Sequence, residues 1–554
     1  MRFRSTAAAA GAVALLAANL LAPPAALAVA PPVIDPGALP PDETPGPDQE
    51  MRQNKACVTP VVIGDPDVAQ PPPGNAMLAI REAWQYSTGA GVSVALIDTG
   101  VTPNPRFPAL YPGGDYVMGL ENGGLTDCES HGTIVASIIG AAPANPADRP
   151  TARPAGARPM APPPAVDANP APTIPPPAPP KPSTVTVTAP PPPPPPAPEP
   201  PPPGAPPPPP PPGVAPAQGA ANPGGPQPLI GGPPPQGPDG VIGVAPDVTL
   251  ISIRQSSTAF SPARPDPNDP DQAKRKAGDI VTLAKAIRHA ADLGVRVINI
   301  SAASCINAAA PVNQDALGAA IRYAVVEKDV VVVAAAGNKG EGPDCGQNPA
   351  FNPLNPDDPR DWAGVRTIVT PAWFSDYVLT VGAVTPDGQP MPDSINGPWV
   401  SVAAPGWRIM GLSNTNGAAV NALPDRDPGL GNNFWGTSFS AAYVTGVVSL
   451  VRAKFPQLTA RQVMRRITET AHNPPRGVDN QVGFGVVDPV AALTFDVAVG
   501  DPKPVERLTT DLYVPPPPPG PDLRPRNMAL IGGAAVLVLA AVIAAVTGVR
   551  RRMS

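Results

Sequence analysis

A serine at the start of an apolar segment is the first candidate for chemistry in this chain. Ser438 lies in the run Gly436–Ala442 (GTSFSAA), between an irregular Gly-, Asn- and Pro-rich stretch over 414–433 and apolar residues over 442–451. A serine at such a loop-to-helix junction can expose its hydroxyl at a cleft, where helix N–H groups can stabilise an oxyanion. Helix capping explains the same residues equally well, because Ser and Thr are favoured at N-caps.

Three upstream blocks decide between these interpretations. Asp98 ends an apolar strand, His131 opens a small-residue helix over 131–140, and Asn338 ends the apolar run 330–338. An Asp, a His and then a Ser at the ends of such elements follow the chain order of one known catalytic triad. Together the blocks DTG, HGT and GTSFSAA resemble those of the subtilase family of serine proteases. The resemblance covers residues 75–495, apart from one long insertion.

The resemblance implies a role for each of these residues. Asp98 would accept a hydrogen bond from His131 and fix its tautomer, and His131 would move the proton. Ser438 would be the nucleophile, and Asn338 would donate to the oxyanion together with the Ser438 N–H. A turn at a strand end is the alternative for Asp98 and for Asn338 taken singly.

A segment after a further strand is expected to hold the substrate. In the family this segment, here Ser301, Ala302 and Ala303, lines the cleft and pairs with the peptide as an added strand. The usual Gly-Gly pair is absent, because Ser304 and Cys305 stand there. The shape of the pocket therefore does not follow from the resemblance.

Strand, helix and strand patterns alternate along the segments 248–254, 279–293 and 295–301. Such repeats predict a parallel sheet with helices on both sides. The fold class is therefore α/β, with a subtilisin-like catalytic domain over 76–497. A helix over 76–86, with an apolar stripe, is expected to open it.

The three histidines of the chain limit the alternatives for the general base. His289 falls in an amphipathic helix over 280–293, and His472 follows a helix over 460–470. Neither lies in a small-residue motif, which leaves His131. With few histidines, and cysteines expected in disulfides, neither a zinc site nor another cofactor is expected. Subtilases often bind calcium, but no acidic cluster has suitable spacing, so calcium binding stays open.

Residues 1–30 have the basic start, apolar centre and small-residue cleavage site of a secretory signal peptide. An uncleaved anchor is the alternative. Four cysteines in an exported chain suggest two disulfides, for which three connectivities exist. Cys305 and Cys345 follow strands expected to be neighbours, so we expect that pair, which leaves Cys57 for Cys128.

Residues 31–75 are rich in Pro, Asp and Gly. Most subtilases carry a folded propeptide here, but so short a segment of this composition can hardly form its own core. We expect an extension that wraps the catalytic domain and is attached through Cys57. A short, cleaved propeptide is the alternative.

Most of the 93 prolines in this chain of 554 residues lie in low-complexity segments, chiefly an insert over 141–240. Proline lacks the N–H that helices and sheets need, so extended or disordered chain is expected there. A proline-rich ligand for a recognition domain is the alternative. The net charge of −6 gives no reason to expect nucleic-acid binding.

A second Pro-rich linker over 498–527 precedes an apolar run over 528–549. About 21 apolar residues suffice for one transmembrane helix. Three arginines follow, so the tail 550–554 is expected in the cytoplasm. These features predict a single-pass plasma-membrane protein with an extracytoplasmic catalytic domain.

This layout resembles that of the mycosins, the membrane-anchored subtilases of mycobacterial type VII secretion systems. The resemblance implies cleavage of secreted protein substrates and stabilisation of the secretion membrane complex, with its membrane components as partners. A scaffold with dispensable proteolysis is one alternative. A membrane-tethered housekeeping protease is the other. The cleaved bond and the secretion system served do not follow from the sequence.

Overall fold

The computed structural model describes residues 29–64, 66–119, 123–152, 239–264, 279–352, 354, 358–424, 431–509 and 524–552. Its contacts form two units, Met1–Thr509 and Thr510–Ser554. The predicted signal peptide, except its last two residues, lies outside the described residues. So do most of the Pro-rich insert and the centre of the second linker.

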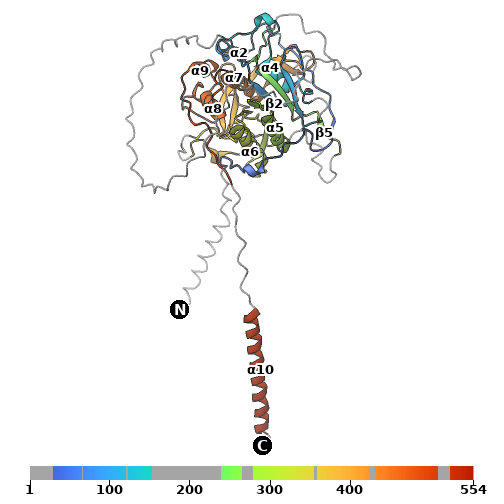
Figure 1. Cartoon of the computed structure of the whole chain (residues 1–554), viewed down its shortest axis with the longest axis vertical. Coiled ribbons are helices and arrows are strands. Elements are labelled where there is room, and N and C mark those ends of the chain that lie inside the picture. The colour runs from blue at the N-terminus through green and yellow to red at the C-terminus, as the bar shows by residue number, and fades with distance from the viewer. Residues whose placement is uncertain are drawn as a thin grey trace, which may run out of the picture. The chain divides into compact units, whose positions relative to one another are not determined.

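A parallel sheet of seven strands forms the centre of the first unit (Figure 1). Its order is β11-β10-β8-β6-β2-β4-β3. Helices cover parallel sheets on both faces, so their strands are apolar throughout. The residues of β6, β8 and β10 are all buried here. The strands are β2 (Ser93–Asp98), β3 (Leu110–Asp115), β4 (Thr249–Arg254), β6 (Val297–Ile300), β8 (Val331–Ala335), β10 (Val378–Val384) and β11 (Val400–Pro405).

Two groups of helices cover the sheet. Helices α4 and α7 pack against each other, and α5 packs against α6; Figure 1 shows the first pair above β2 and the second pair below it. All but the last two residues of α7 are buried. These helices are α4 (His131–Gly140), α5 (Ile280–Asp292), α6 (Asp315–Arg322), α7 (Thr437–Lys454), α8 (Ala460–Glu469) and α9 (Pro489–Thr494). The predicted α/β fold is thereby confirmed.

Short elements complete the unit. The helix expected over 76–86 is instead two pieces, because Ala79 adopts the left-handed conformation with φ 48°. The short helices are η1 (Pro36–Ala38), α2 (Pro73–Met77), α3 (Ile80–Ala83), η2 (Pro146–Asp148), η4 (Tyr323–Glu327) and η5 (Trp362–Gly364). The short strands are β1 (Met51–Gln53), β5 (Phe260–Pro262), β7 (Ser304–Asn307), β9 (Thr367–Thr370), β12 (Trp407–Ile409), β13 (Gly411–Leu412), β14 (Ala419–Val420), β15 (Ala422–Pro424) and β16 (Gly431–Trp435).

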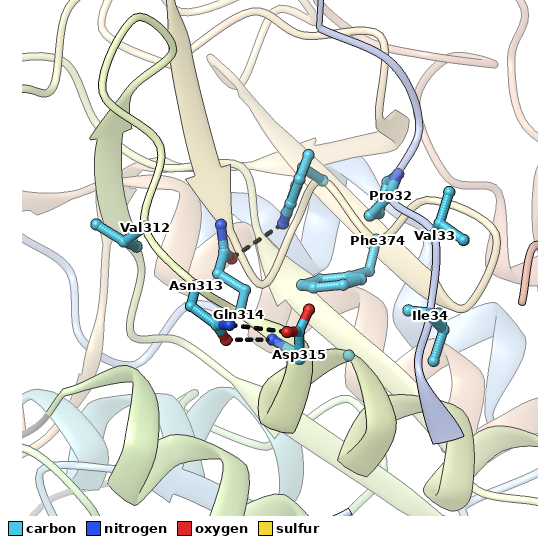
Figure 2. A pocket seen from close by; sticks show the side chains of 10 residues that line it. Pro32, Val33, Ile34, Val312, Asn313, Gln314, Asp315 and Phe374 are labelled. Atoms are coloured by element: carbon cyan, nitrogen blue, oxygen red, sulfur yellow. Dashed lines mark hydrogen bonds between the residues drawn. The ribbon is translucent and has the colours of Figure 1, made fainter. Parts of the chain in front are cut away.

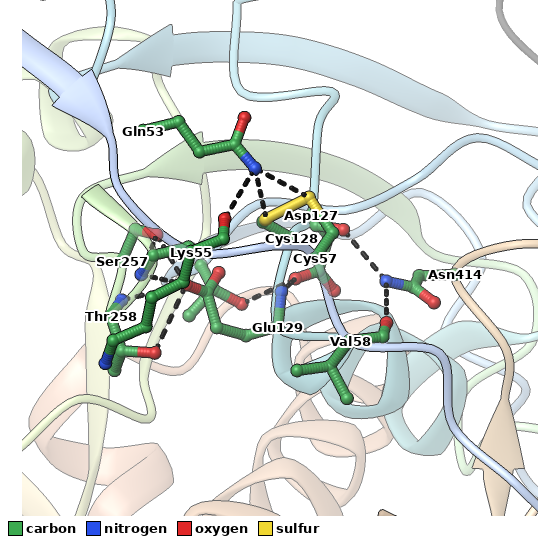
Figure 3. The surroundings of a disulfide bond; sticks show 12 residues. Gln53, Lys55, Cys57, Val58, Asp127, Cys128, Glu129, Ser257, Thr258 and Asn414 are labelled. Atoms are coloured by element: carbon green, nitrogen blue, oxygen red, sulfur yellow. Dashed lines mark hydrogen bonds between the residues drawn. A yellow bond between two sulfur atoms is a disulfide. The ribbon is translucent and has the colours of Figure 1, made fainter. Parts of the chain in front are cut away.

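The N-terminal extension lies along the catalytic domain through backbone contacts at separate places. β1 pairs antiparallel with β5, and Val61 forms a bridge with Ala422. The Cys57–Cys128 disulfide joins the extension to the loop before α4, and the Val58 N–H donates to the Cys128 carbonyl at 2.8 Å (Figure 3). The extension therefore contacts the catalytic domain at β5, at Ala422 and at the loop before α4.

The folded unit extends beyond the boundary expected at residue 497. The Ile34 N–H donates to the Arg507 carbonyl at 2.7 Å, and the Thr509 N–H donates to the Ile34 carbonyl at 2.8 Å. Glu506 also pairs with Arg322 at 2.6 Å. Residues 501–509, predicted as part of the linker, are thus attached to the domain beside the extension.

Ile34 is the residue of the extension that enters the main core. Its side chain is 1% exposed, and Figure 2 shows it beside Phe374 and α6. Residues Pro32–Ile34 and 312–315 face each other across a small pocket. The buried Ile34 side chain therefore attaches the first residues of the N-terminal extension to the catalytic domain.

The second unit contains helix α10 (Arg524–Arg552). Across the described part of the chain, no helix combines the length with the sustained apolar character that a bilayer crossing needs. The membrane span over 528–549 stays a prediction from the sequence.

Ile34→Ala should lower the free energy of unfolding by about 2–5 kcal/mol, because it removes a buried branched side chain and leaves a cavity. Urea denaturation of the full chain measures this loss. Val33→Ala is the matched control, since Val33 is 51% exposed and should change stability little. Equal losses for the two variants would contradict the anchoring role of Ile34.

Candidate active site

The carboxyl end of β2 places Asp98 in the interior. Its side chain is 1% exposed, and Oδ1 accepts from the Thr99 N–H at 2.7 Å and from His131 Nδ1 at 2.7 Å. His131 donates in this bond because a carboxylate only accepts. A Cβ on Gly132 would lie 2.0 Å from the Gly100 carbonyl oxygen and 3.1 Å from Asp98 Oδ1. Only glycine after His131 therefore lets helix α4 start this close to β2.

His131 is the first residue of α4, and its side chain is 30% exposed. Burial lowers its pKa, but the charge and hydrogen bond of Asp98, together with the charges of Asp127 and Glu341, raise the pKa to about 9. Its ring lies 5.3 Å from that of Phe439, the residue after Ser438. The Asp98 carboxylate therefore favours the protonated imidazole, which lies close to the start of α7.

Ser438 is the second residue of α7. Its hydroxyl donates to the Ser301 carbonyl oxygen at 2.8 Å, and the Ser301 hydroxyl donates back to the Ser438 carbonyl at 3.2 Å. Within the described residues, the Ser438 hydroxyl has no hydrogen bond to His131. The structure thus joins Asp98 to His131 and places His131 against the residue that follows Ser438, while the serine hydroxyl is bonded to the backbone after β6.

Asn338 follows β8 and faces the start of α7. Its Oδ1 accepts from the Thr437 N–H at 2.9 Å and from the Thr437 hydroxyl at 3.0 Å. The backbone N–H can only donate, so this bond fixes which side-chain atom is oxygen. The amide nitrogen donates to Glu341 Oε1 at 2.9 Å. Gly436 makes room, since a Cβ there would lie 3.0 Å from that nitrogen.

The substrate-binding segment predicted at Ser301–Ala303 follows β6. Ser301 is buried, whereas Ala302 and Ala303 are partly exposed and belong to no strand. The Cys305–Cys345 disulfide ties this region to the loop after Asn338. Both expected cysteine pairs are therefore bonded in the structure.

A second buried carboxylate, Asp127, lies behind Asp98 and was given no role from the sequence. It accepts from the Thr99 hydroxyl at 2.9 Å, and from the Thr133 N–H at 2.8 Å and hydroxyl at 2.7 Å. Burial raises its pKa to about 6, although the Thr133 hydrogen bonds oppose this and the charge of Asp98 adds to it. Asp127 thereby links the residue after Asp98 to the first turn of α4. The sequence feature that could have indicated this role is its position four residues before His131.

The other histidines lie outside this group. His289 pairs with Asp42 of the extension at 3.2 Å, and His472 pairs with Asp488 at 3.1 Å. Among the described residues, no group of three or more His, Cys, Asp or Glu is arranged to hold a metal ion.

The chain is similar to known proteases over almost its whole length. The model of the subtilase family matches residues 218–485, which include Asn338 and Ser438 but not Asp98 and His131 on the other side of the insert. Mycosin-2 of Mycobacterium tuberculosis is 53% identical over 97% of each chain. Mycosin-5 of the same organism is 47% identical over 98% of this chain and 95% of its own length.

Solved structures show the same similarity. MycP1 from the ESX-1 type VII secretion system is 42% identical, with a TM-score of 0.65 over 86% of this chain and 100% of its own. A chain of an intact ESX-5 inner membrane complex is 44% identical, with a TM-score of 0.65 over 93% of this chain and 99% of its own. A further similar structure is described as that of a serine protease, MycP1.

The His131 imidazole should titrate with a midpoint near pH 9, the value that the Asp98 carboxylate helps to maintain. Asp98→Asn removes that charge, so the midpoint should fall well below 9. NMR of the three histidines measures both midpoints. Asp488→Asn is the control, because it should lower the pKa of His472, which Asp488 raises, and leave His131 unchanged. A His131 midpoint unaffected by Asp98→Asn would contradict the electrostatic account.

Proposed function

The chain belongs to the mycosins, serine proteases of the subtilase family, and on that premise we propose that it cleaves protein substrates as a component of a type VII secretion system. One observation carries the catalytic part. The buried Asp98 carboxylate accepts from His131 at 2.7 Å, and the His131 ring lies 5.3 Å from that of Phe439, the residue after Ser438 in the first turn of helix α7. This is the arrangement that activates a serine for acyl transfer.

The proposed reaction begins with a rotation of the serine hydroxyl. Ser438 leaves the Ser301 carbonyl and donates its proton to the free ring nitrogen of His131, while its oxygen attacks the scissile carbonyl carbon. Asp98 stabilises the imidazolium that forms. The imidazolium then protonates the leaving amine, and the acyl group stays on Ser438. Water, deprotonated by His131, hydrolyses this ester and regenerates the serine.

Asn338 is proposed to stabilise the oxyanion with its side-chain amide, together with the Ser438 N–H. Thr437 holds the oxygen of this amide through two hydrogen bonds, which directs the nitrogen toward the other side. Donors fixed in advance need no reorganisation when charge develops. This preorganisation supports the role inferred from the resemblance.

The backbone of Ser301–Ala303 is proposed to bind the substrate as an added strand. Ala302 and Ala303 lie outside every strand and are partly exposed, so they can pair with an extended peptide. The Ser301 carbonyl contacts the nucleophile directly. A peptide on this segment would therefore lie beside Ser438.

Export and membrane attachment form the second part of the proposal. The signal at 1–30, the apolar run 528–549 and the arginines of the tail 550–554 support a plasma-membrane protein with its catalytic unit outside. Residues 528–549 lie within α10, whose described large apolar side chains are exposed. The match over 93% of this chain to a chain of an ESX-5 inner membrane complex supports secretion components as partners.

A mainly structural role in the secretion complex is the second candidate. It is favoured by the N-terminal extension and residues 501–509, which are hydrogen-bonded to each other at Ile34 and contain none of the proposed catalytic residues. A catalytic variant distinguishes the two, because a scaffold needs the folded chain but not its hydroxyl. A general housekeeping protease would not copurify with secretion components.

Ser438→Ala should abolish substrate processing in the native host, because acyl transfer loses its nucleophile, with a loss of about 10⁶ in turnover for a triad serine. Secreted-substrate processing and recovery of the membrane complex are the readouts. Ser440→Ala is the control, since this buried hydroxyl two residues later has no hydrogen-bond partner among the described residues. Unchanged processing in Ser438→Ala would contradict the catalytic assignment. If the membrane complex were lost in Ser438→Ala although the chain remained folded and abundant, proteolysis would be required for assembly of the complex.

Leu537→Arg should release the full chain from membranes during alkaline carbonate extraction, because an arginine at the centre of a spanning helix costs about 2.5–3.5 kcal/mol. Val505→Arg is the control, as Val505 is 71% exposed in the catalytic unit. Equal extraction of the natural chain and both variants would contradict the proposed anchor.

A further inference from the structure

The carboxylate of Glu341 accepts a hydrogen bond from the Asn338 amide nitrogen, which is the proposed oxyanion donor. Glu341 Oε1 accepts from the Asn338 amide nitrogen at 2.9 Å, and the Glu341 N–H approaches the Asn338 carbonyl at 3.4 Å. The two residues thus form one tight turn directly after β8. The charge of Glu341 also reaches His131, whose pKa it raises.

The loop that carries Glu341 is held in place on both sides. The Gly340 N–H donates to the Cys345 carbonyl at 3.0 Å, and Cys345 is bonded to Cys305. The Lys339 N–H donates to the Asp393 carbonyl at 2.8 Å. The backbone therefore presents the Glu341 side chain to Asn338, although that side chain is exposed to solvent.

The position of this carboxylate opposes the proposed chemistry. An oxyanion hole works by aiming donors at the point where negative charge develops. A carboxylate on the same amide nitrogen already carries a full negative charge, and two anions near one donor repel each other. In the same structure the Ser438 hydroxyl donates to the Ser301 carbonyl instead of to His131. Both groups needed for attack are therefore engaged by the protein itself.

We propose that Glu341 holds the active site in a resting state by occupying the Asn338 amide, and that this carboxylate withdraws before the oxyanion forms. The inference rests on the proposed roles of Asn338 and Ser438. Glu341 contacts Asn338 and no reacting atom, so it is a positioning residue. Its charge also raises the pKa of His131, so labelling rates are compared at high pH, where His131 is neutral in every variant. Its exposure allows it to turn toward solvent without disturbing the core.

The competing role is that Glu341 orients Asn338 productively, and the two roles predict opposite effects. If Glu341 blocks the donor, its removal speeds acylation. If it orients the donor, its removal slows acylation. Thr437 already fixes Asn338 through two hydrogen bonds, which leaves the amide oriented when Glu341 is absent.

The test uses a fluorophosphonate probe on the purified full chain. Ser438 attacks phosphorus, the P–F bond breaks, fluoride leaves and His131 takes the serine proton. The second-order rate of labelling should rise about tenfold in Glu341→Ala, because the amide no longer bonds a charged acceptor. Asp393→Asn is the matched control, since it removes an exposed carboxylate next to the same loop and should leave the rate unchanged.

A double substitution shows whether the effect passes through Asn338. In the Asn338→Ala background, Glu341→Ala should leave the rate unchanged, because no amide remains to be released. An unchanged or slower rate in the single Glu341→Ala variant overturns the inference. So does equal acceleration in the Asn338→Ala background. Ser438→Ala separates the two proposals: if that variant is labelled as fast as the natural chain, the catalytic assignment itself fails.

Discussion

One geometric constraint underlies the active site: neighbouring parallel strands end at the same edge of a sheet. β8, β6 and β2 are adjacent. Asn338 follows β8, Ser301 follows β6, and Asp98 is the last residue of β2. Residues far apart in the chain therefore meet at this edge of the sheet. Helix α7, almost wholly buried, brings Ser438 to this edge. The chemistry depends on the sheet keeping these ends in register.

Much of this arrangement could be predicted because it depends on local sequence. Apolar runs that end in Asp98 or Asn338 mark buried strands and their edges, and small residues after His131 and around Ser438 mark close approach. Gly132 and Gly436 show the reason in the structure, because a Cβ at either position would collide with backbone or press on the Asn338 amide. Chain order alone then indicated the triad.

Other features could not be predicted because they depend on contacts between distant segments. The hydrogen bonds between Ile34 and residues 507–509 join opposite ends of the folded unit, and composition alone indicated a linker. The periodic apolar pattern over 76–86 predicted one continuous helix, and nothing in that pattern indicated the left-handed conformation of Ala79 that divides it. The role of Asp127 could not be predicted, because only the fold brings Thr99 and Thr133 to its carboxylate. The contact between Glu341 and the Asn338 amide could not be predicted either, because it depends on the side-chain conformation of Asn338.

In the proposed reaction, a neutral His131 activates Ser438. The most direct measurement is the rate of fluorophosphonate labelling against pH, with the labelled residue identified by peptide mass spectrometry. Asp98 raises the pKa of His131 despite its burial, so the neutral base is scarce at pH 7 and becomes abundant as pH rises through about 9. The account predicts labelling of Ser438 alone, with a rate that rises with pH around that midpoint. A rate independent of pH between 7 and 10, or a label on another residue, would contradict it.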